Sequence, residues 1–494
     1  MFTRNQHDTP LFDGLKAYAA ENRLPFHIPG HKKGRGMDHA FRSFLGQQAL
    51  DIDLINIEPL DDLHHPAGII HEAQLTAADA FGADYTFFSV QGTSGAIMTM
   101  IMSVCSPGDK LIVPRNVHKS IMSAVVFSGA TPIFIHPDID ENLGISHGIT
   151  RQAAARAVKS HPDAKGLLVI NPTYFGYAAD LQGIVETAHE AGMPVLVDEA
   201  HGVHIHFHEQ LPLSAMQAGA DLAATSVHKL GGSLTQSSIL NVQGNLVSTK
   251  KVQAVMSMLT TTSTSYILLA SLDAARRHLA VSGRDILDET IRLAEILRKE
   301  VSRIPGLYVP GSDILNSTSC YDYDVTKVTV SVKDLHITGH EAEVFLRRNC
   351  RIEVELSDLY NVLFLITPGD STESINLLIE ALAELSRAYA ASGTWKDNDT
   401  PVEVPNIPIL SYSPRDAFYA DTETVPLSQA AGRISAEFIM IYPPGIPIFI
   451  PGEMIEQQNL DYIEKNIQSG LPVQGPEDET LEKIRVIQER KAIT

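Results

Sequence analysis

Cysteine is scarce in this 494-residue sequence: Cys105, Cys320 and Cys350 lie far apart and show neither CxxC nor Cys/His ligand spacing. An odd, scattered set argues against a disulfide framework and a zinc site, and it is typical of a reducing compartment. No run of about 18 apolar residues occurs, and residues 1–20 contain no apolar signal core. We therefore expect a cytoplasmic protein with no bound metal and no membrane contact.

Basic residues are also few, since 38 Lys and Arg face 59 Asp and Glu and the formal net charge is −21. Nucleic-acid binding relies on clustered Lys and Arg, so no nucleic-acid partner is expected. A negative field favours cationic small molecules, but it also simply keeps a large protein soluble. The patterns GxGxxG and GxxxxGK[ST] are absent, which argues against two common modes of nucleotide binding.

From about residue 75 to about residue 250, short apolar runs alternate with helical segments that have a polar face. The runs are residues 85–90, 110–114, 131–137, 165–172, 193–200 and 221–229. Nearly continuous apolar strands separated by helices are typical of a mostly parallel sheet flanked by helices. The sequence thus predicts an α/β fold, in which ligands bind at the carboxyl ends of the strands.

The chain is long enough for two or three domains. Its first part holds an amphipathic stretch and the loop PFHIPGHKKGRG, whose prolines and glycines exclude a regular helix. The predicted parts are an N-terminal arm (1–50), a large domain (51–310), a smaller α/β domain (311–395) and a C-terminal α+β domain (396–494). We also predict a long helix over 276–310, a linker at 397–408 and a charged helix near 477–491.

Several of the predicted strand ends carry polar side chains. Gly92, Thr93, Ser94 and Gly95 follow the first run at the start of a helix, where N–H groups and hydroxyls favour an anion. Later strand ends carry His118, then Asp198 with Glu199 and His201, and finally Lys229. Each signal alone also fits a structural role, such as a helix cap, an ion pair or a lysine that reaches solvent.

The combination of these groups is more informative than any one of them. A lysine partly removed from water loses proton affinity, so its amine becomes a nucleophile toward an aldehyde. Pyridoxal 5′-phosphate requires donors for its phosphate, a flat partner for its ring, an acid for its ring nitrogen and an amine for its aldehyde. Ser226 and His228, close to Lys229, can add donors for the same phosphate.

These residues lie in motifs that together resemble the pyridoxal-phosphate-dependent ornithine/lysine/arginine decarboxylases, which have the aspartate-aminotransferase (type I) fold. The motifs span nearly the whole chain: FHIPGHKKG (26–34), LDDLHHP (60–66), GTSG (92–95), RNVHKS (115–120), NPTYFG (171–176), VDEAHG (197–202), SVHK (226–229) and YPPGIPIFIPGE (442–453). The length resembles the short bacterial form, and the sequence is most similar to the biosynthetic arginine decarboxylases.

The resemblance implies roles for matching residues around the cofactor. Lys229 bonds covalently to pyridoxal phosphate, and Asp198 pairs with the ring nitrogen. His118 stacks on the ring, and His201 lies near the ring hydroxyl. The phosphate is bound by Gly92, Thr93, Ser94, Ser226 and His228.

The resemblance also implies that a second subunit completes each site. TTTSTSY (260–266) resembles the segment that lends a hydroxyl to the partner's phosphate, and we assign this role to Thr262, although relatives often have Ser-Pro where this chain has Ser263-Thr264. Glu453 matches the acid that meets the distal cation of the substrate. Asp61, Asp62 and His64 either line the entrance to the substrate site, from this or from the partner subunit, or form a solvated turn. We therefore expect a homodimer or a higher homo-oligomer with shared active sites.

The expected reaction is decarboxylation of a basic amino acid, with arginine giving agmatine and CO2 in polyamine biosynthesis. Lysine, giving cadaverine, and ornithine stay open, because one carboxylate binds either a guanidinium or an ammonium. Lys229, His201 and His228 are the candidates for protonating the α-carbon. An aminotransferase or aldolase on the same fold and a non-catalytic relative are the alternatives from other classes. A transaminase would need an arginine such as Arg433 or Arg347.

Overall fold

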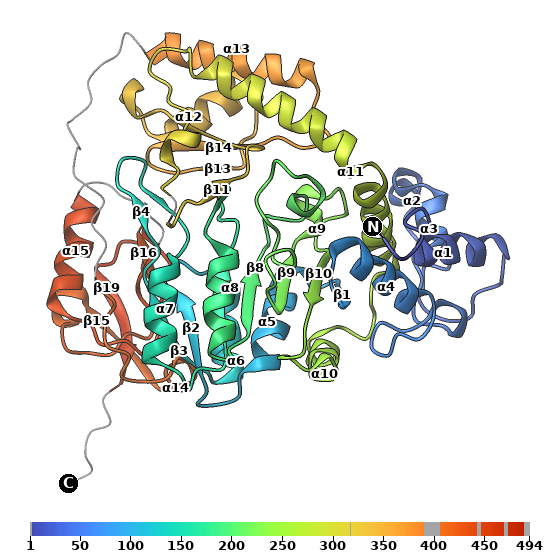
Figure 1. Ribbon diagram of the computed structural model, residues 1–494, viewed down its shortest axis with the longest axis horizontal. Helices are drawn as coiled ribbons and strands as arrows, with labels where there is room; N and C mark the ends of the chain where they lie inside the picture. Colours follow the sequence, from blue (N-terminus) through green and yellow to red (C-terminus); the bar gives the residue numbers. More distant parts are fainter. Residues whose placement is uncertain (1, 317, 390–405, 442–445, 469–472, 489–494) are drawn as a thin grey trace. The chain divides into compact units, whose positions relative to one another are not determined.

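The computed structural model describes residues 2–316, 318–389, 406–441, 446–468 and 473–488 (Figure 1). It divides into two compact units, each built from two stretches of chain. Unit 1 comprises Met1–Val104 and Leu181–Leu287, and unit 2 comprises Cys105–Asp180 and Asp288–Thr494. The predicted four-part division stays a prediction, because these units divide the chain at other points.

Unit 1 contains four neighbouring strands in the order β1-β10-β9-β8. Their bounds are Tyr85–Ser89 for β1, Ser238–Val242 for β10, Leu222–Thr225 for β9 and Val195–Asp198 for β8. β8 and β9 are parallel, whereas β10 is antiparallel to both β1 and β9. Apart from the first residue of β1, all side chains of these strands are buried, as expected for a sheet covered on both faces. The polar segment before β10 hid this strand from the sequence prediction.

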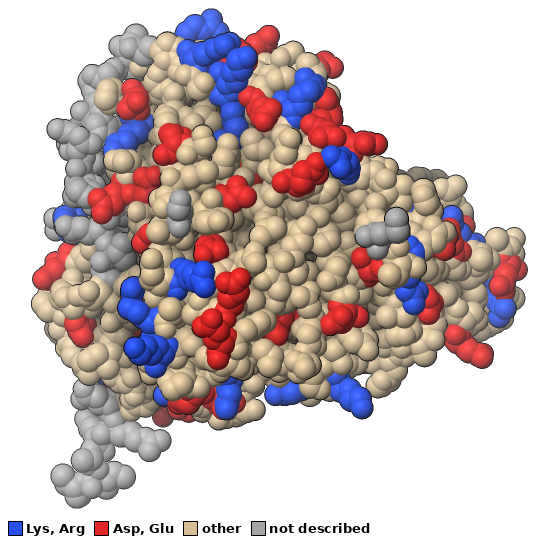
Figure 2. Space-filling view, viewed as in Figure 1, with Lys and Arg blue, Asp and Glu red and all other residues tan. Residues whose placement is uncertain are grey.

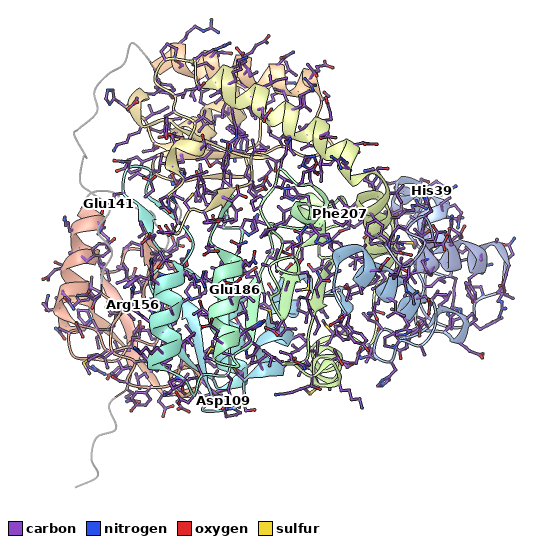
Figure 3. All side chains as sticks on the ribbon, in the orientation of Figure 1. His39, Asp109, Glu141, Arg156, Glu186 and Phe207 are labelled. Atoms are coloured by element: carbon purple, nitrogen blue, oxygen red, sulfur yellow. The ribbon has the colours of Figure 1, made fainter. Side chains whose placement is uncertain are left out.

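The helices of unit 1 follow the amphipathic stretches of its sequence. They are α1 (Pro10–Ala20), α2 (His39–Leu45), α3 (Gln47–Asp51), α4 (Ile69–Phe81), α5 (Gly92–Val104), α8 (Leu181–Glu190), α9 (Val227–Leu230), α10 (Thr249–Leu259) and the first part of α11 (Tyr266–Val301). α1 packs on α4, and α10 packs on α5. On α8, Glu186 lies on the exposed face (Figure 3). The predicted loop at 25–36 contains no helix.

Unit 2 contains three strands in the order β6-β2-β3, with β2 parallel to both neighbours. The strands are Leu167–Ile170 (β6), Lys110–Pro114 (β2) and Thr131–Ile135 (β3). Helices α6 (Lys119–Ser128) and α7 (Arg151–Ser160) lie between them in sequence. Arg156 marks the exposed face of α7 (Figure 3). Short pairs β4–β5 (Ile139–Asp140, Ile145–Ser146) and β7–β11 (Tyr177–Ala178, Asp322–Tyr323) complete this part.

A second core of unit 2 is built on the antiparallel sheet β12-β14-β13. Its elements are β12 (Lys327–Ser331), α12 (Gly339–Phe345), β13 (Leu356–Ser357), β14 (Asn361–Leu365) and α13 (Thr372–Tyr389). Leu293, Leu297 and Val301 of α11 are buried in this core. The predicted helix at 276–310 is real, but it begins earlier, at Tyr266, and ends at Val301.

The last part of the chain forms two small sheets, β15-β19 and β17-β16-β18. The elements are α14 (Pro414–Tyr419), β15 (Thr422–Pro426), β16 (Ile439–Ile441), β17 (Ile446–Phe449), α15 (Gln457–Gln468), β18 (Val473–Gln474) and β19 (Lys483–Ile487). The charged helix predicted near 477–491 is therefore wrong. Ile484 and Val486 alternate with polar residues and are buried in the C-terminal core, and this two-residue period is that of a strand.

The mixed sheets flanked by helices confirm the predicted α/β fold. Most of the predicted linker at 397–408 lies outside the described residues. On the face in view, acidic and basic side chains are interspersed (Figure 2). None of the described helices is both long and apolar enough to cross a membrane.

Candidate active site

Lys229 lies in α9, the short helix that directly follows β9. Its Nζ atom is 2.7 Å from Nε2 of His201, which is buried after β8. Two cations would repel each other at this distance. The contact therefore requires that at least one of the two groups be neutral, so the pair can hold and exchange a proton. The assignment of both residues to catalysis stays a prediction.

Asp198 is the last residue of β8 and is 5% exposed. Burial raises the pKa of this carboxyl, while the backbone N–H of Ala200 and the positive charge of Lys229 act in the opposite direction. The carboxylate accepts a hydrogen bond from the Ala200 N–H at 3.2 Å. A cationic ring nitrogen would be a favourable partner for such an acid, because it would offset the cost of burying the charge.

Glu199 follows Asp198 and is also buried. Its two oxygens accept hydrogen bonds from the Ala215 N–H at 2.7 Å and from the Thr225 hydroxyl at 3.0 Å. Burial, aided by the neighbouring Asp198 charge and opposed by the hydrogen bonds from Ala215 and Thr225, raises the pKa of Glu199 to about 7. These hydrogen bonds tie the end of β8, which carries Asp198, to Ala215 and Thr225.

A cluster of hydroxyls lies at the start of α5. Thr93 is hydrogen-bonded to Ser226, and its Oγ1 is 2.8 Å from Oγ of Ser238. Gly92 begins the helix with φ +67°, a conformation that favours glycine. Hydroxyls beside a helix N-terminus suit a phosphate group. The sequence analysis missed Ser238, because its strand, β10, was not predicted.

Two other residues predicted to bind phosphate, Ser94 and His228, differ in their surroundings. Ser94 is in the first turn of α5 but is exposed. Nδ1 of His228 lies 2.8 Å from the Ser237 carbonyl oxygen, to which it donates. That leaves Nε2 of His228 as the atom able to face a ligand. Thr93, Ser226 and the start of α5 fit a phosphate on their own.

Together these groups fit pyridoxal phosphate by the chemistry of the donor set. Unit 1 supplies a lysine amine beside an imidazole, a buried carboxylate near that lysine, and hydroxyls at a helix N-terminus. These are the partners that an aldehyde, a pyridine nitrogen and a phosphate require. No group of three or more His, Cys, Asp or Glu suited to a metal occurs among the described residues.

His118 belongs to unit 2, where it is the N-cap of α6. Its Nδ1 atom is 2.8 Å from the hydroxyl of Ser120 and 3.2 Å from the Ser120 nitrogen. These contacts fix the Nδ1 edge of the imidazole and do not involve the faces of the ring. Stacking of His118 on the cofactor ring stays a prediction.

Glu453 also belongs to unit 2 and is fully buried. Its two oxygens accept from the Arg115 guanidinium at 2.6 and 2.8 Å, and the Ile450 N–H donates to it at 2.9 Å. Burial raises the pKa of Glu453, and the Arg115 charge opposes this shift. Because both oxygens of Glu453 already accept from Arg115, a substrate guanidinium would have to displace Arg115 to form a two-pronged contact with this carboxylate. The sequence analysis had no role for Arg115, although RNVHKS begins with it.

Two segments predicted to serve a partner's site are joined in unit 1. Nε2 of His64 donates to the Thr261 carbonyl oxygen at 3.1 Å, next to the exposed Thr262. The Tyr266 hydroxyl donates to the Asp61 carbonyl oxygen at 2.7 Å. Asp62 accepts from the His64 N–H at 3.0 Å. The loop at 60–66 and the segment at 260–266 therefore form one structural piece.

The loop at 60–66 is held by Asp61, whose side chain accepts N–H groups from both sides of a bend. The donors are the backbone nitrogens of Asp62, Ala67, Gly68, Ile70 and His71, at 2.7–3.2 Å. Burial opposes ionisation, but these donors outweigh it and lower the pKa of Asp61. Asp61 thus turns out to be a structural residue of this loop.

Solved structures define the class first. Lysine decarboxylase A from Pseudomonas aeruginosa is 25% identical to this chain, with a TM-score of 0.82 over 97% of this chain and 80% of that chain. A decarboxylase therefore has the same arrangement of elements over nearly the full length.

The sequence comparisons then identify the family. The Orn/Lys/Arg decarboxylase major domain matches residues 9–374, and the C-terminal domain of the same family matches residues 406–477. An arginine decarboxylase from Bacillus subtilis is 65% identical over 99% of this chain and all of its own length. One from Halalkalibacterium halodurans is 66% identical over 99% of both. The chain belongs to the Orn/Lys/Arg decarboxylase family, and it is a decarboxylase.

Proposed function

We propose that this enzyme uses pyridoxal phosphate to decarboxylate L-arginine, giving agmatine and CO2. The observation that carries the proposal is the 65% identity, over essentially the whole length of both chains, with an arginine decarboxylase. Lysine decarboxylases share the fold at far lower identity. The partly buried Lys229 and the buried His201 and Asp198 of unit 1 supply the chemistry that such a reaction needs.

Pyridoxal phosphate, when bound through Lys229, supplies the electron sink that takes up the electron pair of the broken Cα–carboxylate bond. The other steps fall to side chains of this chain. Asp198 holds a positive charge opposite its carboxylate, and Thr93 with Ser226 anchors the phosphate. His201 places its Nε2 atom 2.7 Å from the Lys229 amine. We propose that this pair returns a proton to the α-carbon after CO2 has left.

The structure distinguishes the two histidines considered as proton donors. His201 touches the Lys229 amine, whereas Nδ1 of His228 is bound to the carbonyl oxygen of Ser237. A proton donor must lie within hydrogen-bond reach of the reacting centre or of the group that relays the proton. We therefore assign the relay to His201 and phosphate binding to His228.

Substrate discrimination depends on the distal end. Because Arg115 already occupies both oxygens of Glu453, we propose that Asp62 and His64, from the joined segments of a partner subunit, contribute to the entrance that a distal cation passes. Glu453 stays a candidate for reading this cation only if Arg115 yields its place. The variants in the Discussion separate the two cases.

Product analysis tests the proposed reaction. Purified protein with pyridoxal phosphate is incubated separately with arginine, lysine and ornithine, each labelled at the carboxyl carbon, and amines and CO2 are identified. We expect agmatine and labelled CO2 from arginine, with far slower release from the other two. Preferential formation of cadaverine or putrescine would replace arginine by the corresponding substrate. Formation of a keto acid would point to a transaminase.

The transaminase alternative has little structural support. Arg433 is bound to Glu423, with Nη2 at 2.5 Å from Oε1, and to the Ile487 carbonyl oxygen. Arg347 lies at the surface and is paired with Glu353 at 2.8 Å and with Glu343. Both candidate arginines for a second carboxylate are thus engaged in ion pairs within the chain.

We further propose a cytoplasmic homodimer or higher homo-oligomer that works in polyamine biosynthesis. Support for shared sites comes from the contact between His64 and Thr261, which places two predicted partner-serving segments together. In polyamine biosynthesis agmatine would be a precursor, so its formation would support the biosynthetic role. Light scattering of the purified enzyme measures the assembly.

A further inference from the structure

A pocket of about 430 Å³ in unit 1 is lined by residues of α4, β1 and the start of α10. This volume is within the range of small-molecule sites. The polar residues of interest that line it are His65, His71, Gln74, Tyr85, Thr249 and Lys250. None of the catalytic candidates of the proposed function lines it, so it is a separate feature.

The charge of the pocket runs against that of the chain. Although the formal net charge is −21, no aspartate or glutamate lines the pocket among the described residues, and its ionisable groups are Lys250, two histidines and a tyrosine. The neighbouring acids are engaged elsewhere. Glu72 pairs with Arg4 at 2.8 Å, and Asp84 accepts the Gly244 N–H at 2.8 Å.

Of the polar side chains in the pocket lining, Gln253 and Thr86 are hydrogen-bonded within the chain, but several others have no partner among the described residues. Gln74 is only 6% exposed, yet its amide has no hydrogen bond to any described residue, and buried amides of native proteins are nearly always paired. The side chains of His65, His71 and Lys250 likewise have no hydrogen-bond or ion-pair partner within the described part of the chain. His65 and Lys250 are exposed, so solvent satisfies their donors, whereas the buried, unpaired amide of Gln74 favours a bound acceptor.

Backbone geometry adds to this donor set. Thr249 and Lys250 are the first two residues of α10, and the Ser248 hydroxyl caps the third, accepting from the Lys251 N–H at 3.4 Å. The N–H groups of the first two residues have no acceptor within the helix and carry its positive dipole end. Both residues belong to the pocket lining.

Another part of the pocket lining is apolar. Tyr85 and Phe87 project from the same face of β1, and their rings are nearly parallel, with centroids 6.5 Å apart. Leu75 and Pro66 continue this surface. A bare inorganic anion would leave this apolar surface uncovered, so the ligand carries an apolar group next to its charge.

We propose that this pocket binds a small-molecule phosphate monoester, whose phosphate is held by Lys250, Gln74 and the two histidines and whose apolar or aromatic group packs on Tyr85 and Phe87. Each of these groups acts as a donor or an apolar surface, and a dianion with a flat substituent matches both. Phenyl phosphate is a suitable probe, because inorganic phosphate and phenol each represent one half of it.

Calorimetry on the holoenzyme tests the proposal. Phenyl phosphate should bind once per subunit, at least about tenfold more tightly than inorganic phosphate or phenol. Lys250→Gln and Gln74→Leu should each weaken binding about fivefold or more. Lys251→Gln, the matched control one residue away and outside the pocket, should leave binding unchanged. Retention of the cofactor's visible absorption shows that the probe has not displaced the cofactor.

Histidine modification with diethyl pyrocarbonate, mapped by mass spectrometry, places the ligand. Phenyl phosphate should protect His65 and His71 and should not protect the exposed His39. The proposal is overturned if no saturable binding occurs, if Lys250→Gln binds like the parent, or if phenol alone binds as well as phenyl phosphate. It is also overturned if His65 and His71 are shielded without ligand and react only when the oligomer dissociates, since a second copy of the chain would then occupy the pocket.

Discussion

At the scale of single residues, the contact between Lys229 and His201 links the structure to the proposed chemistry. Lys229→Ala removes the amine that bonds to the cofactor, so we expect loss of turnover and of the cofactor's visible absorption. His201→Gln keeps the cofactor bond but removes a titrating group, so the rate should fall by about 10²-fold and the pH profile should lose one limb. Steady-state kinetics with arginine measure both effects.

Lys159→Ala, on the exposed face of α7, is the control for these variants and should behave as the parent enzyme. Turnover by Lys229→Ala at the parent rate would remove this lysine from the mechanism. An unchanged pH profile in His201→Gln would assign the proton relay to another group.

Glu199 predicts a pH dependence of stability. Its pKa is raised by burial to about 7, so the folded protein holds a proton that the unfolded chain releases near its ordinary value of 4.5. Stability contributed by this residue is therefore highest below about pH 4.5 and falls as pH rises toward 7, by at most about 3 kcal/mol. Glu199→Gln should flatten this slope.

Unfolding in urea at pH 5 and pH 8 provides the measurement. The difference in midpoint between the two pH values should shrink in Glu199→Gln, because glutamine can keep both hydrogen bonds without titrating. Glu186→Gln, which changes an exposed carboxyl of α8 (Figure 3), should leave the difference as it is. An equal shrinkage in both variants would contradict the assignment.

The pair of Arg115 and Glu453 separates a structural from a substrate-binding role. Arg115→Met strands a buried carboxylate and should lower the free energy of unfolding by about 3–5 kcal/mol. Adding Glu453→Leu should recover much of this loss, because no unpaired charge then remains. Chemical denaturation of the single and double variants measures the coupling.

Kinetics of Glu453→Gln complete this test. If the carboxylate chiefly holds Arg115, stability should fall and the KM for arginine should change little. If Glu453 reads the distal cation, the KM should rise by about tenfold or more with stability nearly kept. The two results exclude each other.

At the scale of elements, Asp61 takes the place of a missing N-cap for α4. The residue before the helix, Gly68, has no side chain to cap it. Asp61, which lies several residues earlier, accepts the N–H of Gly68 and two N–H groups of the first turn, those of Ile70 and His71. Asp61→Ala should cost about 1–3 kcal/mol and loosen the loop at 60–66. Hydrogen exchange should report faster exchange at Gly68, Ile70 and His71.

Asp38 is the matched control, because it caps α2 through a single N–H, that of Phe41 at 3.0 Å. Asp38→Ala should destabilise less than Asp61→Ala and leave exchange in α4 unchanged. Since its N–H partners lower the pKa of Asp61, its contribution should be present above about pH 4 and vanish as acid protonates the carboxylate. Equal losses from both substitutions would contradict the special role of Asp61.

At the scale of the whole molecule, shared active sites predict complementation between two inactive variants. Lys229→Ala removes the cofactor lysine of one subunit, and Thr262→Glu places a negative charge beside the partner's phosphate. Mixed subunits should regain about a quarter of the parent activity, because half of the dimers then contain one intact site. Activity after denaturation, mixing and refolding measures this. No recovery would contradict a shared site.

The candidate site was largely predictable because its residues follow apolar runs whose strand character is local. Asp198 ends β8, and Lys229 comes four residues after the end of β9, so an α/β pattern alone brought them to one region. β10 was harder to find, because its polar first residue and the hydroxyl-rich stretch before it read as a loop. Its antiparallel pairing with β1 and β9 is a property of distant segments.

The C-terminal part shows the same limit from the other side. The charged residues near 477–491 suggested a helix by composition, yet pairing with β15 selects the two-residue period that buries Ile484 and Val486.

The sequence by itself determined the fold class, the family and the order of the motifs, since these depend on residue types and on spacing along the chain. Only the tertiary structure decided what each polar group touches. In the structure Glu453 is paired with Arg115, and the buried Glu199 accepts from Thr225. His201, and not His228, contacts Lys229. The physical reason is that a buried charge or donor is stabilised by whichever partner the packing places within about 3 Å, and packing depends on segments that the sequence keeps far apart.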